Sequence, residues 1–100
     1  MGDTTDRITP GDLEVCVLTF NRAPLLRQAL ESLLAQTARG FSVSVYDNAS
    51  ADATAETVAA LGPRFGGNFR YIRHRENIGA DANFHAALAG ANRKLSLIHI

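Results

Sequence analysis

The order of short apolar runs and amphipathic segments constrains the fold of this chain more than any other feature. Three runs, residues 13–20, 41–46 and 69–74, have the length and apolar content of buried strands. Each is followed by a segment with helical periodicity, and these segments span residues 23–36, 53–61 and 80–91. The alternation predicts an α/β fold of the Rossmann-like kind, with three layers and a mostly parallel sheet wound on both faces.

Side-chain spacing indicates which face of each helical segment packs against the sheet. The residues expected to face inward are Leu26, Leu30, Leu33 and Leu34 in the first segment, Val58 and Leu61 in the second, and Phe84, Ala87, Leu88 and Ala91 in the third. Gly62 and Pro63 are expected to end the second helix, with a loop over residues 64–68. The third strand carries charges at alternate positions, which favours a place near the sheet edge.

Charge and cysteine content exclude several classes of partner. Ten basic and ten acidic residues give a formal net charge of zero without a basic stripe, which argues against nucleic acid as a partner. The lone Cys16 provides neither a disulfide framework nor a metal-binding spacing. No apolar stretch approaches the ~20 residues that span a membrane, and residues 1–12 are polar. The expected location is the cytoplasm, with a longer parent protein at the cytoplasmic face of the membrane.

The two ends of the chain differ from its middle. Residues 1–12 are expected to form a disordered lead-in. Residues 95–100 admit two interpretations: a short β-strand, or a non-native tail, since Leu-Ser-Leu-Ile-His-Ile resembles a translated sequencing adapter. The composition break after Lys94 favours the second interpretation.

Polar residues follow each expected strand, where ligands bind in parallel α/β sheets. They occupy residues 19–22, 47–52 and 75–83. The first turn has neither a dinucleotide-binding glycine pattern nor a P-loop, so side chains would have to hold a nucleotide. Asp47 is suited to accept a hydrogen bond from a ribose hydroxyl or a base N–H, and it is equally a turn-forming or helix-capping residue.

Three segments, at residues 19–22, 47–54 and 76–79, together resemble the opening half of a family-2 glycosyltransferase with the GT-A fold. The resemblance covers residues 14–91. It implies that Thr19, Phe20 and Asn21 lie against the base and ribose of a nucleotide-sugar and that Asp47 reads the base edge. Phe20 stands where the family usually has tyrosine.

The same resemblance adds further donor-site residues, each with a structural alternative. Asn48 and Asp52 belong to the turn after the second strand, where Asp52 is either a ligand or a cap and Ser50 is expected to cap the second helix. Asn77 and Gly79 match the element before the third helix, with a turn role as the alternative for Asn77. An arginine common in the family just beyond is missing here, and Arg22 or Arg75 could replace it.

The resemblance implies an inverting, hexosyltransferase-type enzyme of polysaccharide biosynthesis. It would transfer a sugar from a UDP- or dTDP-sugar to a hydroxyl of a sugar or lipid-linked acceptor, with Mg²⁺ or Mn²⁺. The family's acidic metal-binding motif and its catalytic base are not found in these residues. Residues 13–94 are therefore expected to be an N-terminal donor-binding portion of a GT-A domain, inactive alone and without metal ligands or catalytic residues.

Two other functions remain open from the sequence. One is a non-catalytic α/β nucleotide-binding or interaction domain. The other is a sugar-phosphate nucleotidyltransferase, which is disfavoured because the glycine-rich, basic opening loop of that class is absent from the sequence.

Overall fold

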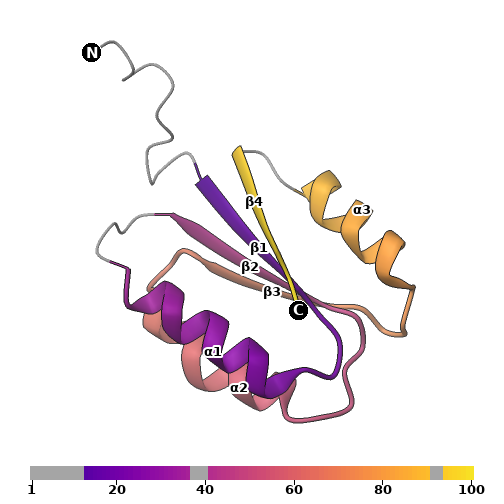
Figure 1. Cartoon of the computed structure of the whole chain (residues 1–100), viewed down its shortest axis with the longest axis horizontal. Coiled ribbons are helices and arrows are strands. Elements are labelled where there is room, and N and C mark those ends of the chain that lie inside the picture. The colour runs from indigo at the N-terminus through magenta and orange to yellow at the C-terminus, as the bar shows by residue number, and fades with distance from the viewer. Residues whose placement is uncertain (1–12, 37–40, 91–93) are drawn as a thin grey trace.

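The computed structural model describes residues 13–36, 41–90 and 94–100, which form a three-layer α/β arrangement. The strands are β1 (Leu13–Thr19), β2 (Ser42–Asp47), β3 (Phe69–Arg73) and β4 (Lys94–His99). The helices are α1 (Ala23–Leu34), α2 (Thr54–Leu61), the short 3₁₀ helix η3 (Gly62–Phe65) and α3 (Ala80–Gly90). All pairings are parallel, in the order β3-β2-β1-β4. Helices α1 and α2 cover one face and α3 the other (Figure 1), so the expected Rossmann-like fold is confirmed.

The main core lies between the sheet and helices α1 and α2. Its fully or nearly buried members are Val15, Val17, Val43 and Val45 from the strands and Leu26, Leu30, Val58 and Leu61 from the helices. The expected inward faces of α1 and α2 are thus confirmed, and Leu33 and Leu34 pack partly buried at the border of this core. Burying one such side chain stabilises a fold by roughly 1.5–3 kcal/mol, so this layer carries most of the packing energy.

Helix α3 packs on the other face with a different set of residues from those expected. Ala87 is buried as expected, but Phe84 and Leu88 are exposed, and the polar Asn83 is buried in their place. The face of α3 turned toward β2 carries Asn83, Ala87 and Gly90. Asn83 Nδ2 donates to the Tyr46 carbonyl at 3.2 Å, Ala87 packs with Tyr46, and a Cβ atom added at Gly90 would collide with the Tyr46 hydroxyl. Ala91 lies outside the described residues.

One further segment of the backbone differs from the expectation. The chain after α2 was expected to run as a loop, whereas Gly62–Phe65 continues as the 3₁₀ helix η3. Strand β3 lies at the sheet edge as predicted, although its charged residues, Arg70 and Arg73, are three positions apart and lie on opposite faces of the sheet. Cys16 is buried in β1, and burial raises the pKa of its thiol to about 11, so the thiol stays protonated at neutral pH.

Residues 94–99 form strand β4, which pairs in parallel with β1. The last six residues thus have the strand backbone that the first interpretation predicts. Whether they are a non-native tail stays a prediction. The boundaries at residues 12 and 94 also stay predictions, and the expected lead-in over residues 1–12 lies outside the described residues. Within the described ranges, no helix has the length and apolar character needed to cross a bilayer.

Candidate functional site

Three polar side chains lie level with one another at the carboxyl ends of the strands. In the parallel register Thr19 of β1 pairs with Asp47 of β2, which pairs with Arg73 of β3. Paired residues of neighbouring strands point to the same face of a sheet. The three side chains therefore gather on the face covered by α1 and α2, at the end of the sheet where ligands bind in this fold class.

Asp47 is the centre of this group and is 0% exposed. Its Oδ1 atom accepts hydrogen bonds from the Ser50 amide at 2.9 Å and from the Ser50 hydroxyl at 2.5 Å. Its Oδ2 atom accepts the hydroxyl hydrogen of Tyr71 and lies 3.8 Å from Nε of Arg73. These donors and the arginine charge compensate the desolvation of the buried carboxylate.

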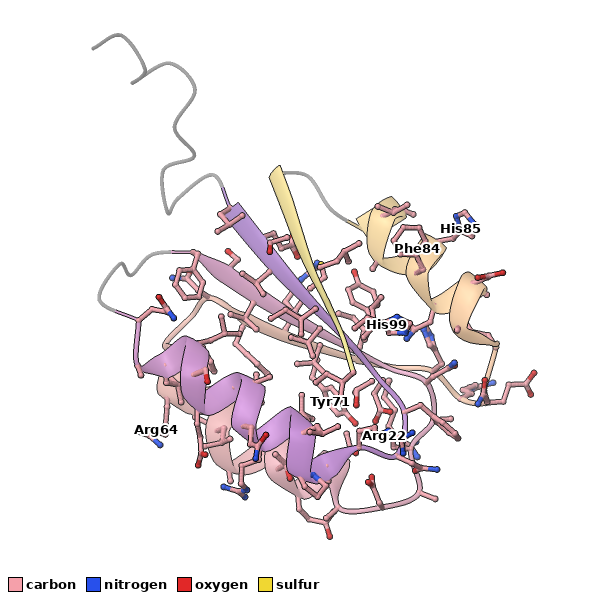
Figure 2. The ribbon with its side chains drawn as sticks, viewed as in Figure 1. Arg22, Arg64, Tyr71, Phe84, His85 and His99 are labelled. Atoms are coloured by element: carbon pink, nitrogen blue, oxygen red, sulfur yellow. The ribbon has the colours of Figure 1, made fainter. Side chains whose placement is uncertain are left out.

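Tyr71 reaches Asp47 from the edge strand β3. Its ring borders the core between the sheet and helices α1 and α2 (Figure 2). Burial, together with the hydrogen bond to the Asp47 carboxylate, raises the pKa of the Tyr71 phenol well above its ordinary value of 10.0. The phenol is therefore a hydrogen-bond donor throughout the neutral range.

The Thr19 hydroxyl differs from the Asp47 carboxylate in its hydrogen bonding. Thr19 is 2% exposed, and among the described residues its Oγ1 is a buried side-chain atom without a hydrogen-bond partner. A buried hydroxyl left without a partner costs roughly 1–3 kcal/mol. This hydroxyl lies in register with Asp47, at the end of the sheet where ligands bind in this fold class.

The loops after β1 and β2 are joined to each other around these residues. The Asn21 amide donates to Ser50 Oγ at 2.8 Å, and Asn21 Oδ1 accepts the Ala51 amide at 2.7 Å. Asn21 and Ala49 have positive φ values of 51° and 65°. For alanine this conformation costs roughly 1–2 kcal/mol, and such strain concentrates at functional sites.

Ser50 and Asp52 have roles that differ from the sequence-based expectation. Ser50 was expected to cap α2, but its hydroxyl joins Asp47 to Asn21. Asp52 provides the capping: Oδ2 accepts the Ala23 amide at the start of α1 at 3.0 Å, and Oδ1 accepts the amide and hydroxyl of Thr54. The Thr54 hydroxyl bond is the main cause that lowers the pKa of Asp52. Asp52 thus has hydrogen bonds at the starts of α1 and α2, and its contact with a ligand stays a prediction.

The loop after β3 is held by the two asparagines that the sequence singled out. Asn48 Oδ1 accepts the Ile78 amide at 2.8 Å, and Asn77 Oδ1 accepts the Gly79 amide at 2.7 Å. Gly79 has φ +89°, a conformation that favours glycine, and its carbonyl accepts the first amide hydrogen bond of α3 from Asn83. These residues shape the rim of the site, and their contact with a ligand stays a prediction.

Tyr71 and Arg73 were not among the residues predicted for the site. Arg22 and Arg75, the arginines suggested from the sequence, are exposed, as is Arg73, and Phe20 is 41% exposed just after β1. Arg73 alone of these arginines ion-pairs with Asp47 and also donates to the Ser50 carbonyl at 3.0 Å. The period of two along β3, which puts residues 69, 71 and 73 on one face, was the signal that could have found both.

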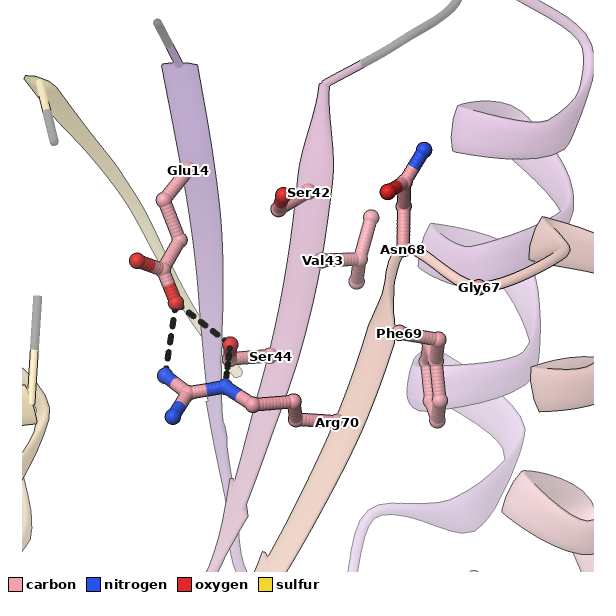
Figure 3. Close-up of a pocket in the computed structure, with 8 residues that line it drawn as sticks. All are labelled: Glu14, Ser42, Val43, Ser44, Gly67, Asn68, Phe69 and Arg70. Carbon is pink, nitrogen blue, oxygen red and sulfur yellow. Dashed lines mark hydrogen bonds and ion pairs between the residues drawn. The ribbon is translucent and has the colours of Figure 1, made fainter. Parts of the chain in front are cut away.

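A second polar cluster lies on the opposite face of the sheet, nearer the amino ends of the strands (Figure 3). Glu14 Oε2 accepts hydrogen bonds from Ser44 Oγ at 2.5 Å and from Arg70 Nη2 at 2.8 Å, and Arg70 Nε donates to Ser44 Oγ at 3.2 Å. These three residues line a pocket of about 260 Å³. The carboxylate, the hydroxyl and the guanidinium are bonded to one another, which is the pattern of a structural ion pair.

A divalent cation was expected for a longer enzyme, and the residues fit no such site here. Within the described ranges, no group of three or more histidine, cysteine, aspartate or glutamate side chains could hold a metal ion. Both oxygens of Asp47 and of Asp52 already accept protein hydrogen bonds. No step of the chemistry is therefore assigned to a metal on these residues.

A parallel sheet with helices on both faces defines a Rossmann-like class of α/β domain, in which ligands bind at the carboxyl ends of the strands. Within that class, residues 14–98 match the family described as glycosyl transferase family 2. The chain belongs to this family.

Individual relatives agree with the family match. Uncharacterised proteins of Mycobacterium tuberculosis and Mycobacterium bovis are 32% identical to the chain over 80 residues, which are 79% of this chain and 23% of each relative. The solved structure of the mannosyltransferase PcManGT from Pyrobaculum calidifontis, in complex with GDP-Man and Mn²⁺, matches with a TM-score of 0.72 and 27% identity. That match covers 85% of this chain and 25% of the mannosyltransferase. The chain thus spans about a quarter of the length of the proteins it matches.

Proposed function

We propose that this chain forms the donor-binding portion of a glycosyltransferase and holds the nucleoside of a nucleotide-sugar at the carboxyl ends of β1 and β2. The observation that carries the proposal is the buried Thr19 hydroxyl, which has no partner within the described part of the chain and lies in register with Asp47. A ribose or base that enters here can satisfy Thr19 and use the carboxylate as acceptor. Phe20, exposed at the same end, offers a ring for the base to stack on.

The base is proposed to be uracil or thymine. Asp47 Oδ1 is held by the amide and hydroxyl of Ser50, so a base edge would bind at Oδ2, in exchange for the hydrogen bond that Oδ2 accepts from the Tyr71 hydroxyl. One acceptor matches the single imide N–H of a UDP- or dTDP-sugar. Guanine presents two adjacent donor groups, N1–H and N2–H₂, and one oxygen would leave the second unpaired. The mannosyltransferase neighbour carries GDP-Man, so guanine is the competing base to be tested.

The activity of the whole enzyme is proposed on the same grounds. Family membership supports sugar transfer over the alternative of a non-catalytic nucleotide-binding domain. Transfer with inversion to a sugar or lipid-linked hydroxyl, in the cytoplasm, is part of the proposal. The Mn²⁺ of the mannosyltransferase complex supports dependence on a divalent cation, with ligands other than the described residues.

Calorimetric titration of the whole 100-residue chain with UDP, dTDP and GDP tests the proposal. We expect UDP and dTDP to bind more tightly than GDP, and Asp47→Asn to weaken UDP binding at least tenfold, which is about 1.4 kcal/mol. Glu14→Gln is the matched control, because it changes a buried carboxylate on the other sheet face and should leave affinity unchanged. An unchanged UDP affinity in folded Asp47→Asn would overturn the site, and tighter binding of GDP would overturn the base assignment.

A further inference from the structure

Asp47 presents its two oxygens to very different surroundings. Oδ1 is bound by the amide and hydroxyl of Ser50, and the same hydroxyl accepts the Asn21 amide at 2.8 Å. Freeing Oδ1 would break both of its hydrogen bonds to Ser50 and disturb the hydroxyl that joins the loops after β1 and β2. Oδ1 is therefore a fixed part of the site.

Oδ2 can be freed by a smaller change. It accepts one direct hydrogen bond, from the Tyr71 hydroxyl, and has Nε of Arg73 at 3.8 Å. Tyr71 is partly exposed and belongs to the edge strand β3. A change of the Tyr71 side chain about χ1 would break this single bond and leave the hydrogen bonds of Ser50 in place.

We propose that Tyr71 is an affinity- and specificity-determining residue of the donor site, whose hydroxyl occupies on Asp47 Oδ2 the position that a base N–H takes when the nucleotide binds. This inference rests on the proposed function. The nucleotide competes with Tyr71 for one acceptor. Breaking the Tyr71 hydrogen bond therefore lowers the net binding energy of every nucleotide-sugar. A base that offers only a ring nitrogen acceptor at this position cannot donate an N–H to Oδ2. It cannot replace the Tyr71 hydroxyl on Asp47, so it binds weakly.

Arg73 adds the second half of the recognition pattern. It lies beside Oδ2 and is held in place by its hydrogen bond to the Ser50 carbonyl. Its guanidinium has five N–H donors, more than these contacts use. An acceptor oxygen beside a donor guanidinium is complementary to a base edge with an N–H next to a carbonyl group. Uracil, thymine and guanine all present this pair, and guanine differs by its additional N2–H₂ donor, for which Asp47 has no free oxygen.

The variant Tyr71→Phe tests the competition directly, since it removes the hydroxyl and keeps the ring. We expect UDP and uridine to bind three- to tenfold more tightly to Tyr71→Phe than to the unmodified chain. Inorganic pyrophosphate, which has no base, should bind both equally. Tyr46→Phe is the matched control, because Tyr46 lies on the opposite sheet face against α3 and should change neither affinity.

The outcomes separate this inference from the proposed function. If UDP binds, and Asp47→Asn abolishes binding while Tyr71→Phe leaves it unchanged or weaker, the role of Tyr71 is overturned and the donor site stands. An equal gain for UDP and pyrophosphate also overturns it, because the gain would not involve the base. If UDP binds neither the unmodified chain nor Tyr71→Phe, the proposed donor site fails and this inference fails with it.

A second measurement needs no change at Tyr71. The chain has two tyrosines and no tryptophan. With tyrosine labelled with ¹³C at Cζ, Tyr46→Phe leaves one NMR signal, that of Tyr71. Saturating UDP should move this signal toward the position of a solvent-exposed phenol, and a signal that stays in place while UDP binds would contradict displacement.

Discussion

The two buried carboxylates of the sheet have similar partners and different surroundings. Glu14 and Asp47 each contact a serine on β2 or the loop after it and an arginine from β3. Around Glu14 the arginine is bonded at 2.8 Å, whereas at Asp47 the arginine is 3.8 Å away and the Tyr71 hydroxyl takes the direct bond. In the Glu14 cluster the charged groups are hydrogen-bonded to one another. In the Asp47 cluster the Tyr71 hydroxyl is a donor that a ligand can replace, and the buried Thr19 hydroxyl lies in register with Asp47. Burial of charge alone does not distinguish a functional site from a structural one.

The largest expected effect on stability is at the structural cluster. Glu14→Ala removes the partner of Arg70 and of the fully buried Ser44 hydroxyl, and we expect the free energy of unfolding to fall by about 2–3 kcal/mol. Urea denaturation measures this change. UDP affinity of the folded fraction should be unaltered, and a loss of affinity would mean that the two clusters are coupled.

At Thr19 we expect a substitution to raise stability and to lower UDP affinity. Thr19→Val replaces a buried hydroxyl that has no partner in the described ranges, so we expect the free energy of unfolding to rise by about 1 kcal/mol. UDP affinity should fall, because the ligand loses this contact. Denaturation and titration of one sample measure both quantities, and a Thr19→Val variant that loses stability and keeps its affinity would assign the hydroxyl a structural role.

A cap beside the site gives a third, smaller effect. Asp52→Ala removes the acceptor for the Ala23 amide at the start of α1, and we expect a loss of about 1 kcal/mol in unfolding free energy. Asp52→Asn should retain most of this stability, because an amide oxygen still accepts the bond. If both variants lose the same amount, the contribution of Asp52 depends on its charge more than on the hydrogen bond.

The smallest effect concerns alkaline pH. Because burial and Asp47 raise the pKa of Tyr71 in the folded chain, its contribution to stability is full below pH 10, the pKa of an ordinary tyrosine, and is lost as the pH rises through the higher folded value. Unfolding free energies measured from pH 9 upward should therefore fall less steeply for Tyr71→Phe than for the unmodified chain. Identical slopes would show that Tyr71 titrates as an ordinary tyrosine.

The sequence predicted the architecture well, since a period of two or of about 3.6 follows directly from backbone geometry. It placed Thr19 and Asp47 at the carboxyl ends of strands for the same reason. It failed where tertiary contacts decide, as at α3, where Asn83 and Ala87 face Tyr46 and Phe84 is exposed.

Partners far apart in the chain were the other source of error. Ser50 lies near α2 in sequence and was therefore expected to cap it, yet it bonds to Asn21, 29 residues away. Tyr71 is 24 residues from Asp47, and that contact depends on the parallel register of β2 and β3. Strand order and register are properties of the folded sheet, and local periodicity does not contain them.

Mapping of UDP binding by amide chemical shifts in the ¹⁵N-labelled chain tests most directly which of the two clusters is the site. The account predicts that the largest shifts fall on Thr19, Asn48 and Ser50, at the carboxyl ends of β1 and β2, with those of Glu14, Ser44 and Arg70 unchanged. Shifts concentrated around Glu14 and Arg70, with the Asp47 end unaffected, would contradict it.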